Sequence, residues 1–281
     1  IEAIQLIKKL DEEKRLATPF EQHILARYVG WGGLANKFFD ESNPVFEEQR
    51  NTLKKLVSLA EYSAMRESSL TAYYTDPQLI QKMYASLENL GFTGGKILDP
   101  SMGTGNFFSA LPEALQDNSE LYGVELDKIT GQIAKQLHQA TNIQVTGFEH
   151  TKFVDDALDL VITNVPFGQI PIVDQRYEKN HVIHDYFIKR SLDLVHEGGF
   201  VAVITSTATM DKQDDRVRRE LARQANLITA ARLPKNAFTA IAGTDVSSDI
   251  LIFQKTSTPD PSPEWLETTT LSDGRGNTVH Y

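Results

Sequence analysis

Seven short apolar segments, separated mostly by segments of helical composition, constrain the fold of this chain more than any other feature. They span residues 97–98, 121–124, 143–145, 158–163, 200–205, 227–232 and 250–254. Strands that alternate with helices usually form a parallel sheet. No convincing helix separates the last two segments, so we expect the final strand to pair antiparallel in an edge hairpin. The sequence therefore predicts a doubly wound α/β domain with a mostly parallel seven-stranded sheet.

The sequence before this pattern carries only helical signals. Apolar residues recur every third position from Ile4 to Leu10, and Thr18-Pro19 is typical of a helix cap followed by the first helical residue. Gly30-Trp31-Gly32-Gly33 interrupts the helices, either as a tight turn anchored by its tryptophan or as a loop that touches a partner or ligand. We therefore predict a helical N-terminal domain over residues 1–71.

The α/β domain is predicted over residues 72–255. Within it, the interval 147–157 is too short and polar for a full crossover helix. The following segment, 256–263, holds three prolines among serine, threonine and aspartate, a composition typical of linkers. We predict that residues 256–281 form a linker and C-terminal extension. The chain starts at Ile1 without a methionine, so we expect it to be part of a longer protein.

Composition and charge exclude several kinds of function. No apolar run approaches the roughly 18 residues of a membrane span, so we expect a cytoplasmic protein without membrane partners. The absence of cysteine agrees with a reducing compartment and removes a cysteine nucleophile and cysteine-ligated zinc. A net charge of −10 argues against a chain that holds duplex DNA through its phosphates by itself. The arginines from Arg216 to Arg223 lie among acidic residues, so we expect a solvated face there.

A strand end, a glycine turn and a helix start follow one another between Lys96 and Phe107. Glycines let a backbone approach a ligand closely, and the spacing fits neither a dinucleotide fingerprint nor a phosphate loop. A ligand without phosphates is therefore implied. Asp99 at the strand end could hold an ammonium group, and free N–H groups between Gly103 and Asn106 favour a carboxylate.

An acidic residue about 20 positions later, at the end of the next strand, is the usual clamp for a ribose diol. Glu125 stands there, although a charged residue can also cap the following helix. At the third strand, Gly147-Phe148-Glu149 offers an aromatic wall and an acceptor for an adenine amino group. The first half of the predicted sheet is therefore a candidate cofactor site.

The fourth predicted strand runs into Asn164-Val165-Pro166-Phe167. The amide oxygen of Asn164 and the carbonyl of Val165 can accept both hydrogens of an exocyclic amino group, which keeps the nitrogen electron density available for attack. Phe167 can then stack on the ring that carries the amino group. This arrangement suits methyl transfer to a planar amino group, and the alternative is a strand followed by a plain turn.

Two motifs in this order resemble those of a known family. Asp99-Pro100-x-x-Gly103-Thr104-Gly105 followed by Asn164-Val165-Pro166-Phe167 is similar to motifs I and IV of S-adenosyl-L-methionine-dependent amino methyltransferases, especially the N6-adenine DNA class. Tyr73-Tyr74-Thr75-Asp76-Pro77 resembles motif X of that class. The resemblance covers roughly residues 20–255. Further motifs resemble the methylase portion of large phage- and plasmid-encoded methylase–helicase proteins: Gly30-Trp31-Gly32-Gly33, Gly147-Phe148-Glu149 with Thr151, His184-Asp185-Tyr186-Phe187 and Ala242-Gly243-Thr244.

The resemblance implies a Rossmann-like methyltransferase fold that transfers a methyl group from S-adenosyl-L-methionine to N6 of adenine in DNA, without a metal. A stacked adenine cannot reach such a pocket, so a flipped or single-stranded base is implied. A covalently linked helicase, or other domains, would be a partner. The implied cofactor-binding residues are Tyr74, Thr75, Asp99, Pro100, Ser101, Gly103, Thr104, Gly105, Phe107, Glu125, Leu126, Phe148 and Glu149. The implied catalytic residues are Asn164, Val165, Pro166 and Phe167, with Phe167 and Phe238 as aromatic walls around the target base.

Two departures from the family pattern leave other functions open. Position 165 is usually proline in the wider class, whereas Val165 keeps the carbonyl and adds an N–H. No evident segment for reading a DNA sequence follows the α/β domain. The same tetrapeptide would suit a protein glutamine N5-methyltransferase, because a glutamine amide presents the same planar amino group. A further alternative is a non-catalytic module that binds the cofactor or DNA for a linked helicase.

Other polar residues near these motifs have structural interpretations. Thr75 could cap the helix that starts at Pro77 as well as line the cofactor site. We predict an N-terminal cap for Asp185 and a packed side chain for His184, because methyl transfer needs neither a metal nor a strong base. Asp159 opens the fourth strand and is predicted to be structural.

Overall fold

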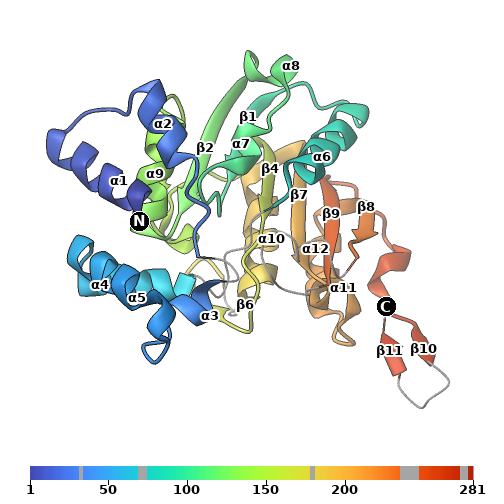
Figure 1. The fold of residues 1–281 in the computed structure, drawn as a ribbon. Helices are drawn as coiled ribbons and strands as arrows, with labels where there is room; N and C mark the ends of the chain where they lie inside the picture. The colour runs from blue at the N-terminus through green and yellow to red at the C-terminus, as the bar shows by residue number, and fades with distance from the viewer. Residues whose placement is uncertain (32–33, 69–74, 178–180, 235–246, 273–277, 281) are drawn as a thin grey trace.

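The sheet that positions the candidate site was expected from seven apolar segments. The computed structural model describes residues 1–31, 34–68, 75–177, 181–234, 247–272 and 278–280. Within these residues, seven strands form one sheet (Figure 1), in the order β3 (Asn142–Val145), β2 (Ser119–Glu125), β1 (Gly95–Asp99), β4 (Leu158–Asn164), β7 (Val195–Ser206), β9 (Ser248–Lys255) and β8 (Ala225–Arg232). The pairs from β3 to β7 are parallel, and β9 is antiparallel to both neighbours. The mostly parallel sheet with an antiparallel edge hairpin is therefore confirmed, with β8 as the outermost strand.

Alternate residues of the central strands face two hydrophobic cores, because successive side chains of a strand point to opposite faces. Leu160 and Ile162 of β4 belong to one core, whereas Val161 belongs to the other. The first core is closed by α6 (Pro77–Asn89) and α7 (Asn106–Ser109). The second is closed by α10 (Ile183–Leu194) and α12 (Arg216–Ala222). Two short helices also lie between the strands: α8 (Glu113–Gln116) precedes β2, and α11 (Ala208–Asp211) follows β7.

The N-terminal helices share an apolar cluster with α9 (Lys128–Leu137), and Figure 1 shows the first two of them beside it. Ile129 and Ile133 of α9 share their apolar cluster, and the side chain of Gln136 accepts a hydrogen bond from the Ala17 N–H at 2.7 Å. Thr18 forms the predicted cap, completed by Glu21 as a capping box. These helices are α1 (Glu2–Glu13), α2 (Pro19–Leu25), α3 (Ala35–Phe38), η2 (Pro44–Phe46), α4 (Glu47–Leu56) and α5 (Leu59–Ser68).

The connections outside the main sheet are short. A single 3-10 turn, η3 (Phe148–His150), lies in the described chain between β3 and β4, so no crossover helix forms there, as predicted. Two small hairpins pair β5 (Pro171–Ile172) with β6 (His181–Val182), and β10 (Thr270–Ser272) with β11 (Thr278–His280). In the C-terminal segment, η5 (Glu264–Leu266) packs Trp265 against Phe253 of β9, with ring centroids 5.9 Å apart. No helix in the described part of the chain is long and apolar enough to cross a bilayer.

Candidate active site

The carboxyl ends of β1 and β4 are joined by buried polar side chains. Oδ1 of Asp99 accepts hydrogen bonds from the Ser101 N–H at 3.1 Å and from Thr163 Oγ1 at 2.7 Å. Ser101 Oγ lies 2.7 Å from Thr163 Oγ1 and 3.0 Å from the carbonyl oxygen of Asn164. The glycine loop and the tetrapeptide, far apart in sequence, therefore meet through two hydroxyl groups.

Asp99 carries an unusual carboxyl group. The residue is 1% exposed, and Oδ2 has no hydrogen-bond partner among the described residues. Burial, together with the nearby negative charge of Glu125, raises the pKa of Asp99 to about 7. A buried acceptor without a donor is costly in a folded protein, so this oxygen fits a ligand that supplies a hydrogen-bond donor.

Glu125 at the end of β2 turns back onto the glycine loop. Its Oε2 accepts from the Gly103 N–H at 2.9 Å, and its Oε1 accepts from the Asp127 N–H at 2.8 Å. Burial raises the pKa of Glu125 to about 7. The Gly105 N–H donates to the carbonyl of Met102 at 2.8 Å. The N–H groups of Gly103 and Gly105 therefore already have acceptors, one on β2 and one in the loop, and the prediction that they are free is wrong for these two residues.

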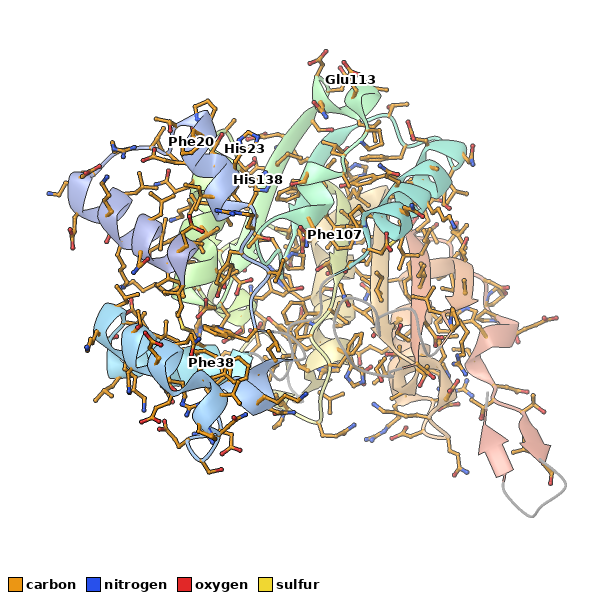
Figure 2. The ribbon with its side chains drawn as sticks, viewed as in Figure 1. Phe20, His23, Phe38, Phe107, Glu113 and His138 are labelled. Atoms are coloured by element: carbon orange, nitrogen blue, oxygen red, sulfur yellow. The ribbon has the colours of Figure 1, made fainter. Side chains whose placement is uncertain are left out.

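The glycines of the loop are required by its backbone and by one neighbour. Gly103 and Gly105 have φ angles of +56° and +92°, which favour glycine. A Cβ atom at Gly105 would overlap the ring of His138. Nε2 of His138 lies 3.0 Å from the carbonyl oxygen of Thr104, and burial lowers the pKa of His138. Figure 2 shows His138 at the end of α9 and the buried Phe107 on α7. Nothing in the sequence pattern distinguished His138.

Asn164 and Thr75 meet at the end of β4. Nδ2 of Asn164 donates to Thr75 Oγ1 at 3.1 Å, and Thr75 is buried. The cap of α6 is Asp76, whose side chain accepts from the Gln78 N–H at 2.8 Å, so Thr75 is not the helix cap. Motif X and the tetrapeptide are therefore in direct contact.

The rest of the tetrapeptide extends the sheet and reaches both cores. Val165 is buried against the face that α10 covers, and its N–H donates to the carbonyl of Ile204 at 3.0 Å. Phe167 is partly buried and packs against the cores on both faces of the sheet. Tyr74 and Phe238, also predicted for this site, lie outside the described residues.

Phe148, in the loop after β3, was predicted to form an aromatic wall of the cofactor site, but its side chain is buried. Phe148 is 2% exposed, and its ring centroid lies 5.0 Å from that of Phe187 on α10. Leu126, which follows Glu125, is 73% exposed. The structure thus groups Thr75, Asp99, Ser101, Glu125 and Asn164, whereas it packs the Phe148 ring into the core.

Of the two structural predictions for the start of α10, the one for Asp185 was wrong. The N-cap of α10 is Val182, and no side chain caps it. Asp185 lies in the first turn instead, where it is buried and accepts from Lys212 Nζ at 3.0 Å. His184 is packed, as predicted, at 1% exposure. The residues next to Asp185 in the sequence give no sign that its partner charge comes from Lys212, 27 positions later.

The arginine cluster divides into solvated and buried members. Arg216 and Arg219 pair with Asp214 and Asp215 on the surface, as expected of a solvated face. Arg218 contradicts that prediction: it is buried, and its guanidinium donates to four main-chain carbonyls. A guanidinium has five donors, so it can be buried when carbonyls surround it. Asp159 is structural as predicted, since it accepts from the Lys96 N–H at 2.7 Å.

Sequence comparison finds two relatives of this chain among known proteins. Defense against restriction protein B of Escherichia phage P1 is 27% identical over 259 residues, which are 90% of this chain and 10% of that protein. The type I restriction enzyme EcoEI methylase subunit of Escherichia coli is 25% identical over 196 residues, 58% of this chain and 38% of the subunit. The chain therefore spans much less than two thirds of either relative.

Structure comparison gives the same fold. The M protein of the type I restriction enzyme EcoKI superposes with a TM-score of 0.54 at 18% identity, over 92% of this chain and 63% of that one. The family described as N-6 DNA Methylase matches residues 57–267, which include the glycine loop, Glu125 and the tetrapeptide. The chain therefore belongs to the N-6 DNA methylase family.

Proposed function

We propose that this chain binds S-adenosyl-L-methionine and transfers its methyl group to N6 of adenine in DNA. The observation that carries the proposal is the hydroxyl bridge of Ser101 and Thr163, which joins Asp99 of the glycine loop to the main chain of Asn164. A cofactor held by the loop and an amino group held by the tetrapeptide would then share one rigid frame. Positioning of this kind can supply a large part of the rate of a direct displacement.

The residues of the loop fit the cofactor in charge and hydrogen bonding. The buried Oδ2 of Asp99 suits the ammonium group of the methionine portion, and Glu125 suits the ribose diol. Glu125 would exchange its bond to the Gly103 N–H for the ribose hydroxyls, which frees that N–H for the ligand. The cofactor supplies the electrophilic methyl group.

The tetrapeptide would orient the amino group that attacks. Thr75 fixes the amide of Asn164 through Nδ2, so that the amide oxygen acts as one acceptor and the Val165 carbonyl as the other. Phe167, at the end of both cores, would stack on the base. An adenine in a duplex must leave the stack to reach this position.

DNA would be gripped largely by other parts of a longer protein. The net charge of this chain is −10, and the phage P1 relative is matched over only 10% of its length. A covalently linked helicase or other domain is the partner that we propose for this task.

The test is transfer of a labelled methyl group. The longer parent protein would be incubated with labelled S-adenosyl-L-methionine and either unmethylated DNA or a release-factor-like protein. We expect label in N6-methyladenine of the DNA. Label that appears on the protein substrate alone would instead support glutamine methylation, and cofactor binding without any transfer would support the non-catalytic module.

A further inference from the structure

An Asp-x-Arg pair in the segment after the tetrapeptide makes contacts that the proposed reaction does not yet use. Nε of Arg176 donates to both carboxylate oxygens of Asp174, at 2.9 and 3.0 Å, and Nη2 donates to Oδ2 at 2.6 Å. Tyr186 Oη on α10 donates to the same Oδ2 at 2.7 Å. The hydrogen bonds of Arg176 and Tyr186 outweigh the effect of burial and hold the pKa of Asp174 near 2, so the carboxylate stays ionised.

The guanidinium of Arg176 also reaches the loop after β3. Nη2 donates to the carbonyl of Glu149 at 2.8 Å, and Nη1 donates to the carbonyl of Thr151 at 3.3 Å. Glu149 lies in the turn Phe148–His150, which carries the predicted adenine-side residues Phe148 and Glu149, and Thr151 follows this turn directly. The Phe148 ring in turn lies against Tyr186, with centroids 6.0 Å apart. One arginine therefore ties the main chain of the β3 loop to the segment that follows the catalytic tetrapeptide.

We propose that Arg176, oriented by Asp174, is a positioning residue that fixes the Phe148–Thr151 loop and thereby forms the adenine end of the cofactor site. This inference rests on the proposed function. A planar guanidinium can bind a carboxylate and two carbonyls at once, whereas a lysine ammonium presents one point charge. Because the contacts are to main-chain carbonyls, they set the position of the loop whatever its side chains are.

The chain contains a matched control. Asp214 and Arg216 repeat the same local pair, with Nε of Arg216 at 2.9 and 2.8 Å from the two oxygens of Asp214. The Arg216 side chain is 78% exposed, and within the described chain its hydrogen bonds go to Asp214 alone. Removing Arg216 thus deletes the same local pair without touching the β3 loop.

The experiment compares Arg176→Ala, Arg176→Lys and Arg216→Ala with the wild-type protein. Affinity for S-adenosyl-L-homocysteine would be measured by calorimetry, and amide hydrogen exchange would be followed over residues 147–152. We expect Arg176→Ala to weaken binding about tenfold and to speed exchange in that loop, because hydrogen bonds to a charged group are lost. Methylation by this variant should show a raised KM for the cofactor with a smaller change in kcat. Arg216→Ala should match the wild type.

The lysine variant guards against a general loss of structure. Arg176→Lys keeps the charge and is expected to remain folded, with an affinity between those of the wild type and Arg176→Ala. Wild-type affinity and loop exchange in both Arg176 variants would overturn the inference. Failure of the wild-type protein itself to bind S-adenosyl-L-homocysteine would instead overturn the proposed function, so the two failures are distinguishable.

Discussion

The N–H of Val165 donates to the carbonyl of Ile204 at 3.0 Å, one residue beyond the last paired position of β4 and β7. Asn164 is the partner of Ile204 in the sheet register, so this bond continues the ladder into the tetrapeptide. The sequence pattern marked Val165 as a departure because proline has no N–H. The extra donor is in fact used by the sheet, and the side chain fills the core beside α10.

Val165→Pro is therefore expected to destabilise the protein while leaving the Val165 carbonyl in place. Loss of a buried main-chain hydrogen bond leaves the Ile204 carbonyl without this donor, at a cost of about 1–3 kcal/mol. Denaturant unfolding would give the change in the free energy of unfolding. The methylation rate per folded molecule should stay close to that of the wild type, because the Val165 carbonyl is retained. An unfolding midpoint equal to that of the wild type would contradict this assignment.

Asn164→Ala should abolish methylation while cofactor affinity changes by less than about twofold, since Asn164 is assigned to the target amino group. Calorimetry with S-adenosyl-L-homocysteine and a methyl-transfer assay would separate the two effects. Asn142→Ala, at an exposed position of β3, is the matched control and should leave both unchanged. Normal methylation by Asn164→Ala would remove the tetrapeptide from the reaction.

Much of this site followed from the sequence because parallel strands bring their carboxyl ends to one edge. The strand ends and their spacing indicated Asp99 and Glu125, and the resemblance to the methyltransferase motifs paired them with Asn164. The contacts of His138 and Arg176 did not follow, because both side chains bind main-chain carbonyls, which have no signature in sequence. The burial of Phe148 was also missed, since its packing partner Phe187 lies on a helix whose approach depends on the whole sheet.

Cofactor binding should tighten as the pH rises from 6 to 8. Burial raises the pKa of Asp99 to about 7, and Asp99 must be ionised to hold an ammonium group. With one proton released on binding, the affinity for S-adenosyl-L-homocysteine is expected to increase about tenfold over this interval. Asp99→Asn should bind weakly at both pH values. An affinity of the wild-type protein that is independent of pH would exclude this role for Asp99.

The same two carboxyl groups should make the unliganded protein less stable at high pH. The pKa values of Asp99 and Glu125 rise from 3.8 and 4.5 to about 7 on burial. Between about pH 4 and 7 the folded state then holds more protons than the unfolded state, so the free energy of unfolding falls as the pH rises. Denaturant unfolding at pH 5 and 8 measures this difference, which should shrink in Glu125→Gln. If Glu125→Gln shows the same difference in unfolding free energy between pH 5 and 8 as the wild type, Glu125 is not a source of the pH dependence.

Gly105→Ala should destabilise the protein more than Gly198→Ala does. Both glycines have positive φ angles, +92° and +82°, so both substitutions carry backbone strain of about 1–2 kcal/mol. A Cβ atom at Gly198 meets open space, whereas one at Gly105 overlaps His138. The difference between the two unfolding free energies therefore measures that overlap. The double variant Gly105→Ala/His138→Ala should lose less than the sum of its single variants, because the alanine at 138 makes room for the new methyl group. Additive losses would show that strain in the loop, and not the packing of His138, requires the glycine.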